Sequence, residues 1–187
     1  MNKKEFFDLI APTAKKICKD RNYGYASFAV CLAQAACETE WGGSSLMMNA
    51  KAVFGIKATK SWTGKVYNAK TKECYDGHTY TTITDCFRAY DSYGDSVTDY
   101  FNLMTLNRYN QSLSPNNGVQ ECITIIKNGG YATSPTYINT IMSIYNDNKD
   151  LIDSYWYTVY NGTVNREQIR QRVLELQDRV KDLLDHI

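Results

Sequence analysis

The sequence predicts an α+β fold that is mainly helical. Apolar residues recur at helical spacing in several stretches of the chain, which is the pattern of helices with one buried face. Between Trp41 and Tyr90 this pattern gives way to β-favouring residues and glycine-containing turns, which predict a small β lobe. A chain of 187 residues has room for one ordinary core and an appendage, so we expect one domain over residues 1–160 and a separate segment over 161–187.

Helical periodicity places the first helix from Lys3 to Asp20, where Pro12 is expected to kink or divide it. The second helix is expected from Ser27 to about Glu38, and it is predicted to be buried because it contains good helix formers and almost no charge. Further helices are expected at 92–104, 119–127 and 134–146, with Ser134 as the N-cap of the last and Pro135 at its first helical position, followed by a packed segment at 151–160.

The β lobe is predicted to contain a hairpin. Residues 65–67 and 78–83 favour strands, and Asp76-Gly77 between them is typical of a tight hairpin turn. Cys74 and Cys86 flank this hairpin, so a disulfide between them is an open alternative. The N-terminus has no recognisable signal peptide, which favours synthesis in a reducing cytoplasm and free thiols.

A carboxylate, Glu38, stands at the end of the second predicted helix, just before a Trp-Gly turn. A carboxyl group at the end of a buried helix is partly desolvated, which raises its pKa and lets it protonate a leaving-group oxygen near neutral pH. This is the chemistry of a glycosidase acid. The alternative is that Glu38 and Glu40 are ordinary solvated residues at a helix C-terminus, where the helix dipole disfavours them. The segment alone leaves both interpretations open.

Six segments of the chain resemble, in the same order, motifs of the glucosaminidases of glycoside hydrolase family 73. The segment from Ala33 to Gly42 is similar to the family's Ala-Gln-Ala-Ala-Leu-Glu-Ser-Gly-Trp-Gly, and the resemblance covers about residues 6–150. The chain departs from the motifs at Cys37, Ala52 and Glu40, and Glu40 adds a rival carboxylate near the predicted acid. The other five segments are 52–57 (Asn-Leu-Phe-Gly-Ile-Lys in the family), 62–64 (Trp-x-Gly), 71–73 (Thr-x-Glu), 87–90 (Phe-Arg-x-Tyr) and 131–137 (Tyr-Ala-Thr-Asp-Pro-x-Tyr).

The resemblance implies a lysozyme-like fold with an active cleft between the helical part and the β-hairpin lobe. It implies that the substrate is the glycan strand of bacterial peptidoglycan. The implied reaction is hydrolysis of the bond after N-acetylglucosamine, an endo-β-N-acetylglucosaminidase activity that needs no metal and no organic cofactor. A chain of this size without a recognisable signal peptide resembles a phage or prophage endolysin or a virion-associated lysin, so we expect it to be made in the host cytoplasm and to act on the bacterial cell wall.

Three catalytic residues are implied by the motif positions. Glu38 is the general acid, Glu73 in the hairpin orients or deprotonates the attacking water, and Tyr131 positions the water or the acetamido group of the substrate. The acetamido carbonyl could itself be the nucleophile, which would leave Glu73 a helper, and the sequence leaves both routes open. The structural alternatives are a solvated hairpin residue for Glu73 and a core tyrosine for Tyr131.

Four aromatic residues are expected at the sugar subsites: Trp41, Phe54, Trp62 and Tyr137. Phe54 is equally suited to line the cleft from the core side. Arg88 is expected to lock the β lobe to the helical part through an ion pair rather than to contact the substrate.

Composition argues against several other functions. The net charge is +1, from 21 Lys and Arg against 20 Asp and Glu, so no basic field favours a nucleic-acid partner. No apolar run approaches the roughly 20 residues of a membrane span, and no Cys or His spacing resembles a zinc site. Two alternatives stay open: a lytic transglycosylase or muramidase that uses Glu38 alone, and a non-catalytic glycan-binding module of a larger assembly.

The tail, residues 164–187, lies outside the resemblance and has a heptad pattern. This spacing is typical of a coiled coil, so we expect the tail to form a homo-oligomer. The alternative is a terminal helix that folds back on its own domain. The apolar residues that alternate in steps of four and three are Ile169, Val173, Leu176, Val180, Leu183 and Ile187.

Overall fold

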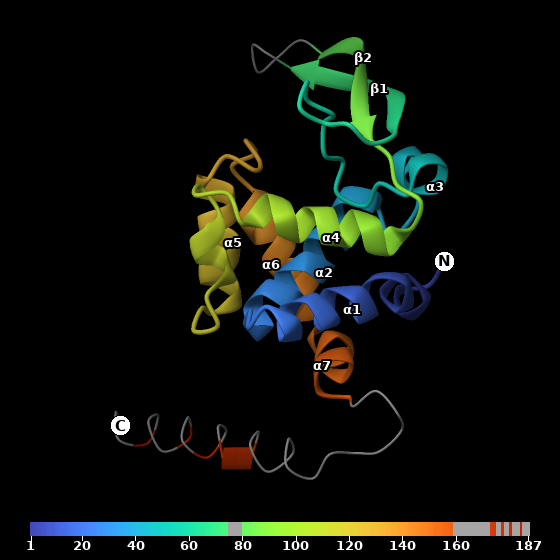
Figure 1. The fold of residues 1–187 in the computed structure, drawn as a ribbon. Coiled ribbons are helices and arrows are strands. Elements are labelled where there is room, and N and C mark those ends of the chain that lie inside the picture. The colour runs from blue at the N-terminus through green and yellow to red at the C-terminus, as the bar shows by residue number, and fades with distance from the viewer. Residues whose placement is uncertain (75–79, 159–172, 175–176, 178–179, 181–183, 185–187) are drawn as a thin grey trace.

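The computed structural model describes the backbone of residues 1–74, 80–158, 173–174, 177, 180 and 184, and the side chains of the same residues except 71–74 and 80–83. The described chain is mostly helical and carries a two-stranded antiparallel sheet (Figure 1), as the sequence predicts. Its elements are α1 (Lys3–Asp20), α2 (Tyr25–Thr39), α3 (Ser45–Ala50), β1 (Val66–Cys74), β2 (Tyr80–Arg88), α4 (Tyr93–Met104), the 3-10 helix η1 (Asn110–Leu113), α5 (Val119–Asn128), α6 (Tyr137–Asp147) and α7 (Lys149–Tyr157).

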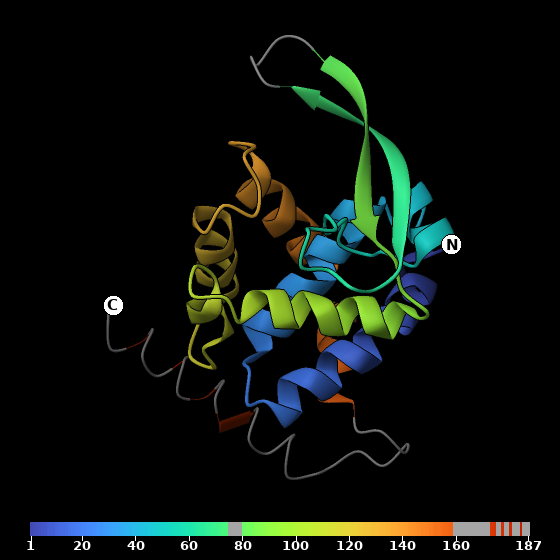
Figure 2. The same ribbon diagram turned by 45° about the horizontal axis from the view of Figure 1, so that its top comes forward.

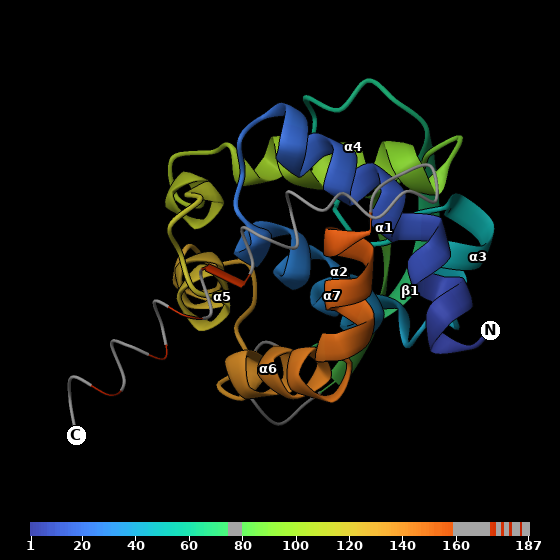
Figure 3. The same cartoon turned by 90° about the horizontal axis from the view of Figure 1, so that it is seen from below.

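The centre of the helical body is α2, which contacts α1, α5, α6 and α7 (Figure 3). The helix is buried from Ala26 to Ala36 because small and apolar residues face all of these neighbours. Phe28 is one anchor, with its ring 5.1 Å from the ring of Trp156 on α7. The prediction of a buried second helix is confirmed, and the helix begins at Tyr25, two residues before Ser27.

Helix α1 begins with a capping box. The Asn2 side chain accepts a hydrogen bond from the Glu5 N–H, and the Glu5 side chain accepts one from the Asn2 N–H, both over 2.9 Å. Pro12 lies inside the helix, which continues through it, so of its two predicted effects the division of the helix is wrong and the kink stays a prediction. Ile10 and Ala14, on either side of Pro12, are buried in one core, and this packing outweighs the hydrogen bond that proline cannot make.

Two features of the helices differ from the prediction. Helix α6 has Thr136 as its N-cap residue, so the prediction that Ser134 caps it is wrong. The Ser134 hydroxyl instead accepts a hydrogen bond from the Thr136 N–H (3.3 Å) and forms a turn ahead of the helix. The short helix α3 was not predicted; it is capped by Ser44, whose hydroxyl accepts from the Met47 N–H (3.2 Å).

The hairpin β1–β2 lies where the sequence predicts, and its strands are longer than predicted. The predicted turn residues 76–77 are outside the described residues. Cys74 pairs with Tyr80, whereas Cys86 lies six residues further along β2 and has a free thiol. Six residues of strand span about 20 Å, which is beyond the reach of a disulfide. The register therefore excludes a bridge between these two cysteines.

The base of the hairpin is attached to the helical body at Asp99 of α4. Nη1 of Arg88 donates to both carboxylate oxygens of Asp99 (3.1 and 2.9 Å), and the Tyr90 hydroxyl donates to the same carboxylate (2.7 Å). The side chains of Arg88 and Asp99 are each 16% exposed, so the ion pair is largely shielded from water. The predicted locking role of Arg88 is confirmed, and Figure 2 shows the hairpin rising from the body.

Most of residues 159–187 lie outside the described part of the chain. Four described apolar positions of the tail, Val173, Leu174, Val180 and Leu184, are helical and exposed. The coiled coil and the oligomer stay predictions. Within the described part of the chain, no helix is both long enough and apolar enough to cross a membrane.

Candidate active site

Glu38 lies in the last turn of α2, one residue before the helix ends. The helix stops because Glu40 takes the left-handed conformation (φ 50°), and Trp41 (φ 58°) and Gly42 (φ 89°) follow it there. Three consecutive positive φ values turn the chain sharply away from the helix. Glu38 is consequently exposed at the surface, while the residues one turn earlier are buried.

The carboxyl group of Glu38 is held by Tyr137 of α6, a residue expected at a sugar subsite. The Tyr137 hydroxyl donates to Oε1 of Glu38 over 3.1 Å. Although the residue as a whole is exposed, protein atoms crowd the carboxyl group on its inner side. This desolvation raises the pKa of Glu38 above its usual value, while the hydrogen bond from Tyr137 acts in the opposite direction. A raised pKa keeps the carboxyl protonated to higher pH, as a general acid requires.

Two buried side chains support Tyr137 from behind. Gln34 lies one turn before Glu38 on α2 and is fully buried. Its Nε2 donates to the Tyr137 hydroxyl (2.9 Å), and its Oε1 accepts from the hydroxyl of Tyr100 on α4 (2.5 Å). Neither Gln34 nor Tyr100 was predicted from the sequence to belong to the site. An amide in an otherwise apolar helix, four residues before a candidate acid, is the signal that points to Gln34.

Tyr131, in the loop that leads into α6, lies next to this group. Its hydroxyl donates to the carbonyl oxygen of Phe54 (3.5 Å), and its ring lies 6.2 Å from the ring of Tyr137 and 6.3 Å from that of Tyr109. Burial raises the pKa of Tyr131, and the negative charge of Glu38 adds to the effect. Tyr131 is therefore a neutral hydrogen-bond donor near the carboxyl group.

The chain that carries this site is similar to known proteins. Residues 11–150 fit the model of the Glucosaminidase family, which is described as mannosyl-glycoprotein endo-beta-N-acetylglucosaminidase. The chain belongs to this glucosaminidase family. The match covers most of the body and the hairpin, and it confirms the resemblance found in the motifs.

Relatives of this glucosaminidase-family chain include enzymes with curated names. Peptidoglycan hydrolase FlgJ of Vibrio parahaemolyticus is 34% identical over 144 residues, which are 74% of this chain and 45% of that protein. Exo-glucosaminidase LytG of Bacillus subtilis is 30% identical over 122 residues, which are 62% of this chain and 42% of that protein. The chain therefore spans less than half the length of these relatives.

A solved structure shows the same fold. The C-terminally truncated glycoside hydrolase domain of Salmonella typhimurium FlgJ superposes with a TM-score of 0.63 at 29% identity, covering 80% of this chain and 99% of that chain. The predicted lysozyme-like α+β fold is confirmed by this likeness.

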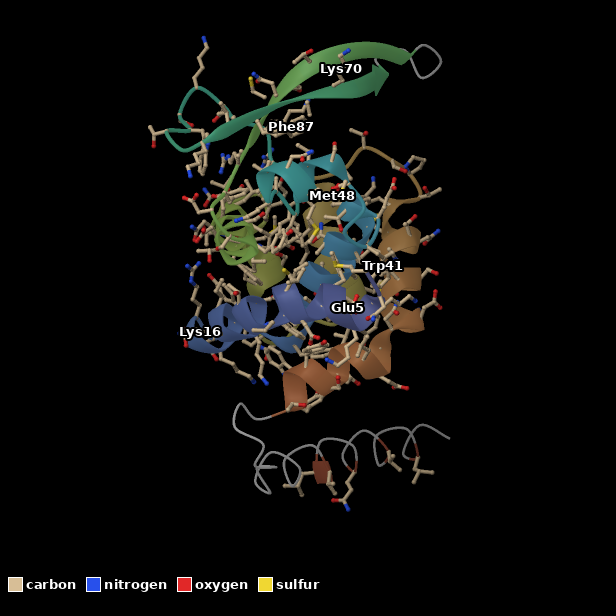
Figure 4. All side chains as sticks on the ribbon, turned by 90° about the vertical axis from the view of Figure 1, so that its right-hand side faces the viewer. Glu5, Lys16, Trp41, Met48, Lys70 and Phe87 are labelled. Atoms are coloured by element: carbon tan, nitrogen blue, oxygen red, sulfur yellow. The ribbon has the colours of Figure 1, made fainter. Side chains whose placement is uncertain are left out.

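Of the aromatic residues expected at the sugar subsites of the glucosaminidase domain, Phe54 is buried in the core and Trp41 is half-buried against it, and a sugar subsite at Trp41 stays a prediction. The ring of Trp41 lies 5.7 Å from Phe6 and 5.5 Å from Phe7 of α1, and Figure 4 shows it on that side of the body. Phe54 is 4% exposed and stacks on Tyr100 at 4.2 Å. These contacts use both rings for packing, and Phe54 takes the core-side position that the sequence left open.

Trp62 lies at the base of the hairpin. Its Nε1 donates to the carbonyl of Lys65 (2.9 Å), its ring centre is 4.6 Å from the guanidinium carbon of Arg88, and its ring centre is 6.0 Å from that of Tyr90. The residue is half-buried. A sugar subsite beside Trp62 stays a prediction.

The two other candidate carboxylates differ from Glu38. Glu73 lies on β1 opposite Thr81, and its side chain is outside the described part of the structure, so its catalytic role stays a prediction. Glu40 is exposed, and no hydrogen bond or ion pair joins its carboxylate to another described side chain. Of the two glutamates at this helix end, Glu38 is thus the one that the protein holds in place.

The described residues contain no group of three or more His, Cys, Asp or Glu side chains placed to hold a metal ion. A hollow of about 450 Å³ lies between α1 and α7, and another of about 700 Å³ lies beside Tyr25 and Trp156. Neither is lined by Glu38, Tyr131 or Tyr137. The candidate site is thus marked by the desolvated carboxyl group and not by either of these hollows.

Proposed function

We propose that this domain is a peptidoglycan hydrolase that cleaves the glycan strand after N-acetylglucosamine, as an endo-β-N-acetylglucosaminidase. The observation that carries the proposal is the hydrogen bond from Tyr137 to the desolvated carboxyl of Glu38, on the central helix of a glucosaminidase-family domain. The names of two relatives, a peptidoglycan hydrolase and an exo-glucosaminidase, support the substrate and the type of bond.

In the proposed reaction, Glu38 supplies the proton for the leaving group. Its neutral carboxyl donates to the glycosidic oxygen as the carbon–oxygen bond breaks and the sugar acquires oxocarbenium character. The carboxylate that remains accepts the hydrogen bond from Tyr137, which stabilises its charge. In this proposal Tyr131, which lies close enough to Glu38 to feel its charge, orients the acetamido group or the water.

The attacking group comes from one of two sources in this proposal. Glu73 on the hairpin activates a water molecule, or the acetamido carbonyl of the substrate attacks and Glu73 assists it. Both routes use Glu38 as the acid. They differ in how strongly turnover depends on Glu73.

The products of digestion test the proposal. Purified peptidoglycan is digested, reduced with borohydride and analysed by mass spectrometry. New reduced N-acetylglucosamine ends are expected, and an early release of long fragments distinguishes an endo from an exo enzyme. The Glu38→Gln protein, prepared in parallel, is the control for contaminating hydrolases and should release none.

Other products would contradict the proposal, each in a recognisable way. Reduced muramic acid ends would indicate a muramidase, and anhydro ends would indicate a lytic transglycosylase. Binding to peptidoglycan without new ends would indicate a glycan-binding module of a larger assembly.

We also propose that the domain acts on the bacterial cell wall and that residues 164–187 mediate self-association. The heptad pattern supports the second point. Light scattering at micromolar concentration should show an oligomer for the full chain and a monomer after residues 164–187 are deleted. A monomeric full chain would favour the fold-back helix. Synthesis in the host cytoplasm and a phage or prophage origin stay predictions.

A further inference from the structure

Four side chains form one line of hydrogen bonds that ends at the candidate acid. Tyr100 of α4 donates to Oε1 of Gln34 (2.5 Å), Nε2 of Gln34 donates to the Tyr137 hydroxyl (2.9 Å), and Tyr137 donates to Oε1 of Glu38 (3.1 Å). Gln34 and Glu38 are four residues apart on α2, so both project from the same face of one helix. The line therefore ties the acid to α4 and α6.

The chemistry of each group gives this line a direction. A hydroxyl group has one hydrogen, so if Tyr137 accepts from Gln34, its hydrogen is free to point at Glu38. If the amide of Gln34 were reversed, Tyr137 would donate to Gln34 and place a lone pair against the ionised carboxylate. In the observed orientation Oε1 of Gln34 accepts from the Tyr100 hydroxyl, so both ends of the amide are hydrogen-bonded when Nε2 faces Tyr137.

The polar groups of this line are buried, and burying a polar group costs free energy. Gln34 and Tyr100 are 0% and 1% exposed, and polar groups in such places are tolerated only when their hydrogen bonds are made. A methionine at position 34 would fill a similar volume without that requirement. The amide is therefore better explained by what it does to Tyr137 than by packing.

We propose that Gln34 and Tyr100 are positioning residues that fix the direction of the hydrogen bond from Tyr137, so that Oε1 of Glu38 is always an acceptor and Oε2 carries the transferable proton. This inference rests on the proposed function, in which Glu38 is the general acid. An acid whose proton is confined to one oxygen needs no rearrangement before it meets the glycosidic oxygen.

Three neutral side chains near Glu38, those of Tyr137, Tyr131 and Cys37, keep their protons while it titrates. Burial raises the pKa of Tyr137 and Tyr131 above that of free tyrosine, and burial raises the pKa of the Cys37 thiol beside Glu38. The direction of the line therefore does not change over the pH range in which Glu38 gains or loses its proton.

The pH dependence of turnover tests the proposal. In Tyr137→Phe the ionised carboxylate loses a donor, so the pKa of Glu38 should rise and the alkaline limb of the kcat profile should move up by roughly half to one pH unit. We expect kcat at the optimum to fall at least about tenfold because the acid is no longer held in place, with KM nearly unchanged. Tyr100→Phe should shift the limb in the same direction and by less.

A matched control separates this effect from general damage to the core. Tyr145→Phe makes the same chemical change on the same helix, α6, where the hydroxyl of Tyr145 faces Tyr25 instead of Glu38. Its pH profile should match that of the unaltered protein. Gln34→Met is a second variant of the line, and it should move the limb in the same direction as Tyr100→Phe.

If a variant loses too much activity for a pH profile, the pKa of Glu38 is measured directly by titration. Carbon-13 NMR of the side-chain carboxyl should show a higher pKa in Tyr137→Phe than in the unaltered protein, provided circular dichroism shows that the fold is kept. A lower pKa would mean that Glu38 donates to Tyr137, which reverses the proposed direction. An unchanged pKa in Tyr137→Phe, or a Tyr100→Phe protein identical to the control, would also overturn the proposal.

Failure of the proposed function has a different signature. If Glu38→Gln stays active, the acid is misassigned and the function falls. If Glu38→Gln is inactive and the variants of the line behave like Tyr145→Phe, the function stands and only the positioning role is lost.

Discussion

The helical body and the hairpin are held in place by different physical means. Helix α2 is packed by other helices on several sides, and Gln34 in its middle is fully buried. The hairpin has two strands, and a two-stranded sheet is at best marginally stable alone. Its base is attached by the Arg88–Asp99 pair and by a bridge between Lys57 and Phe87. The position of the acid thus depends on the whole core, while the position of the hairpin depends on a few contacts, and a single substitution can remove one of them, the Arg88–Asp99 pair.

Glu38→Gln tests the chemistry of the body and should have the largest effect. Gln has nearly the same shape and cannot give up a proton, so we expect peptidoglycan hydrolysis to fall at least about a hundredfold while the thermal unfolding midpoint changes little. Turnover assays on purified cell walls measure the loss. Glu40→Gln is the control and should stay active; an inactive Glu40→Gln beside an active Glu38→Gln would show that the acid is Glu40.

Glu73→Gln tests the chemistry assigned to the hairpin. Because Glu73 is proposed to act on water and not to bind sugar, we expect kcat to fall roughly tenfold to a hundredfold with glycan affinity retained. Steady-state kinetics and a pull-down with insoluble peptidoglycan measure the two quantities separately. A rate close to that of the unaltered protein would show that the water does not depend on Glu73 and would favour attack by the acetamido group.

Asp99→Asn tests the attachment of the hairpin to the body. It leaves the guanidinium of Arg88 shielded and without its counter-charge, so we expect a loss of about 1 to 2 kcal/mol in the free energy of unfolding. Hydrogen exchange should accelerate in the hairpin and stay unchanged in α2. Asp91→Asn is the matched control, since its pair with Lys65 is solvent-exposed and such pairs contribute little. Equal acceleration in both variants would contradict the role of Asp99.

Glu40→Gly tests the turn that ends α2 and should have the smallest effect. Glu40 has a positive φ, a backbone conformation that has a higher free energy for a residue with a Cβ atom than for glycine. We expect the free energy of unfolding to rise by about 0.5 to 1 kcal/mol, with activity unchanged. Urea denaturation measures the gain. Glu40→Ala keeps the Cβ atom and should not reproduce the gain, and a gain of the same size in Glu40→Ala would exclude relief of backbone strain.

Local patterns predicted most of the fold because they act over short stretches of chain. The apolar periodicity of α1 and the uncharged composition of α2 identified both helices close to their observed bounds. The boundary of α6 was wrong by three residues because Ser134 has two uses for its hydroxyl, a helix cap or a short turn, and the sequence does not distinguish them. The predicted division of α1 at Pro12 was wrong for a related reason, since the penalty of a proline is local and the packing that offsets it is not.

For the site, the sequence was sufficient to propose Glu38 as the acid and to predict Arg88 as the link to the helical body, because each stands in a local motif with a chemical meaning. Only the tertiary structure placed Tyr100 and Tyr137 at the two ends of the Gln34 amide, 66 and 103 residues away along the chain. Hydrogen bonds of that separation depend on how α2, α4 and α6 pack, and no short-range pattern encodes that packing. The same is true of Trp41 and Phe54. The sequence identified them as large aromatic residues, and the tertiary packing decided which rings they contact.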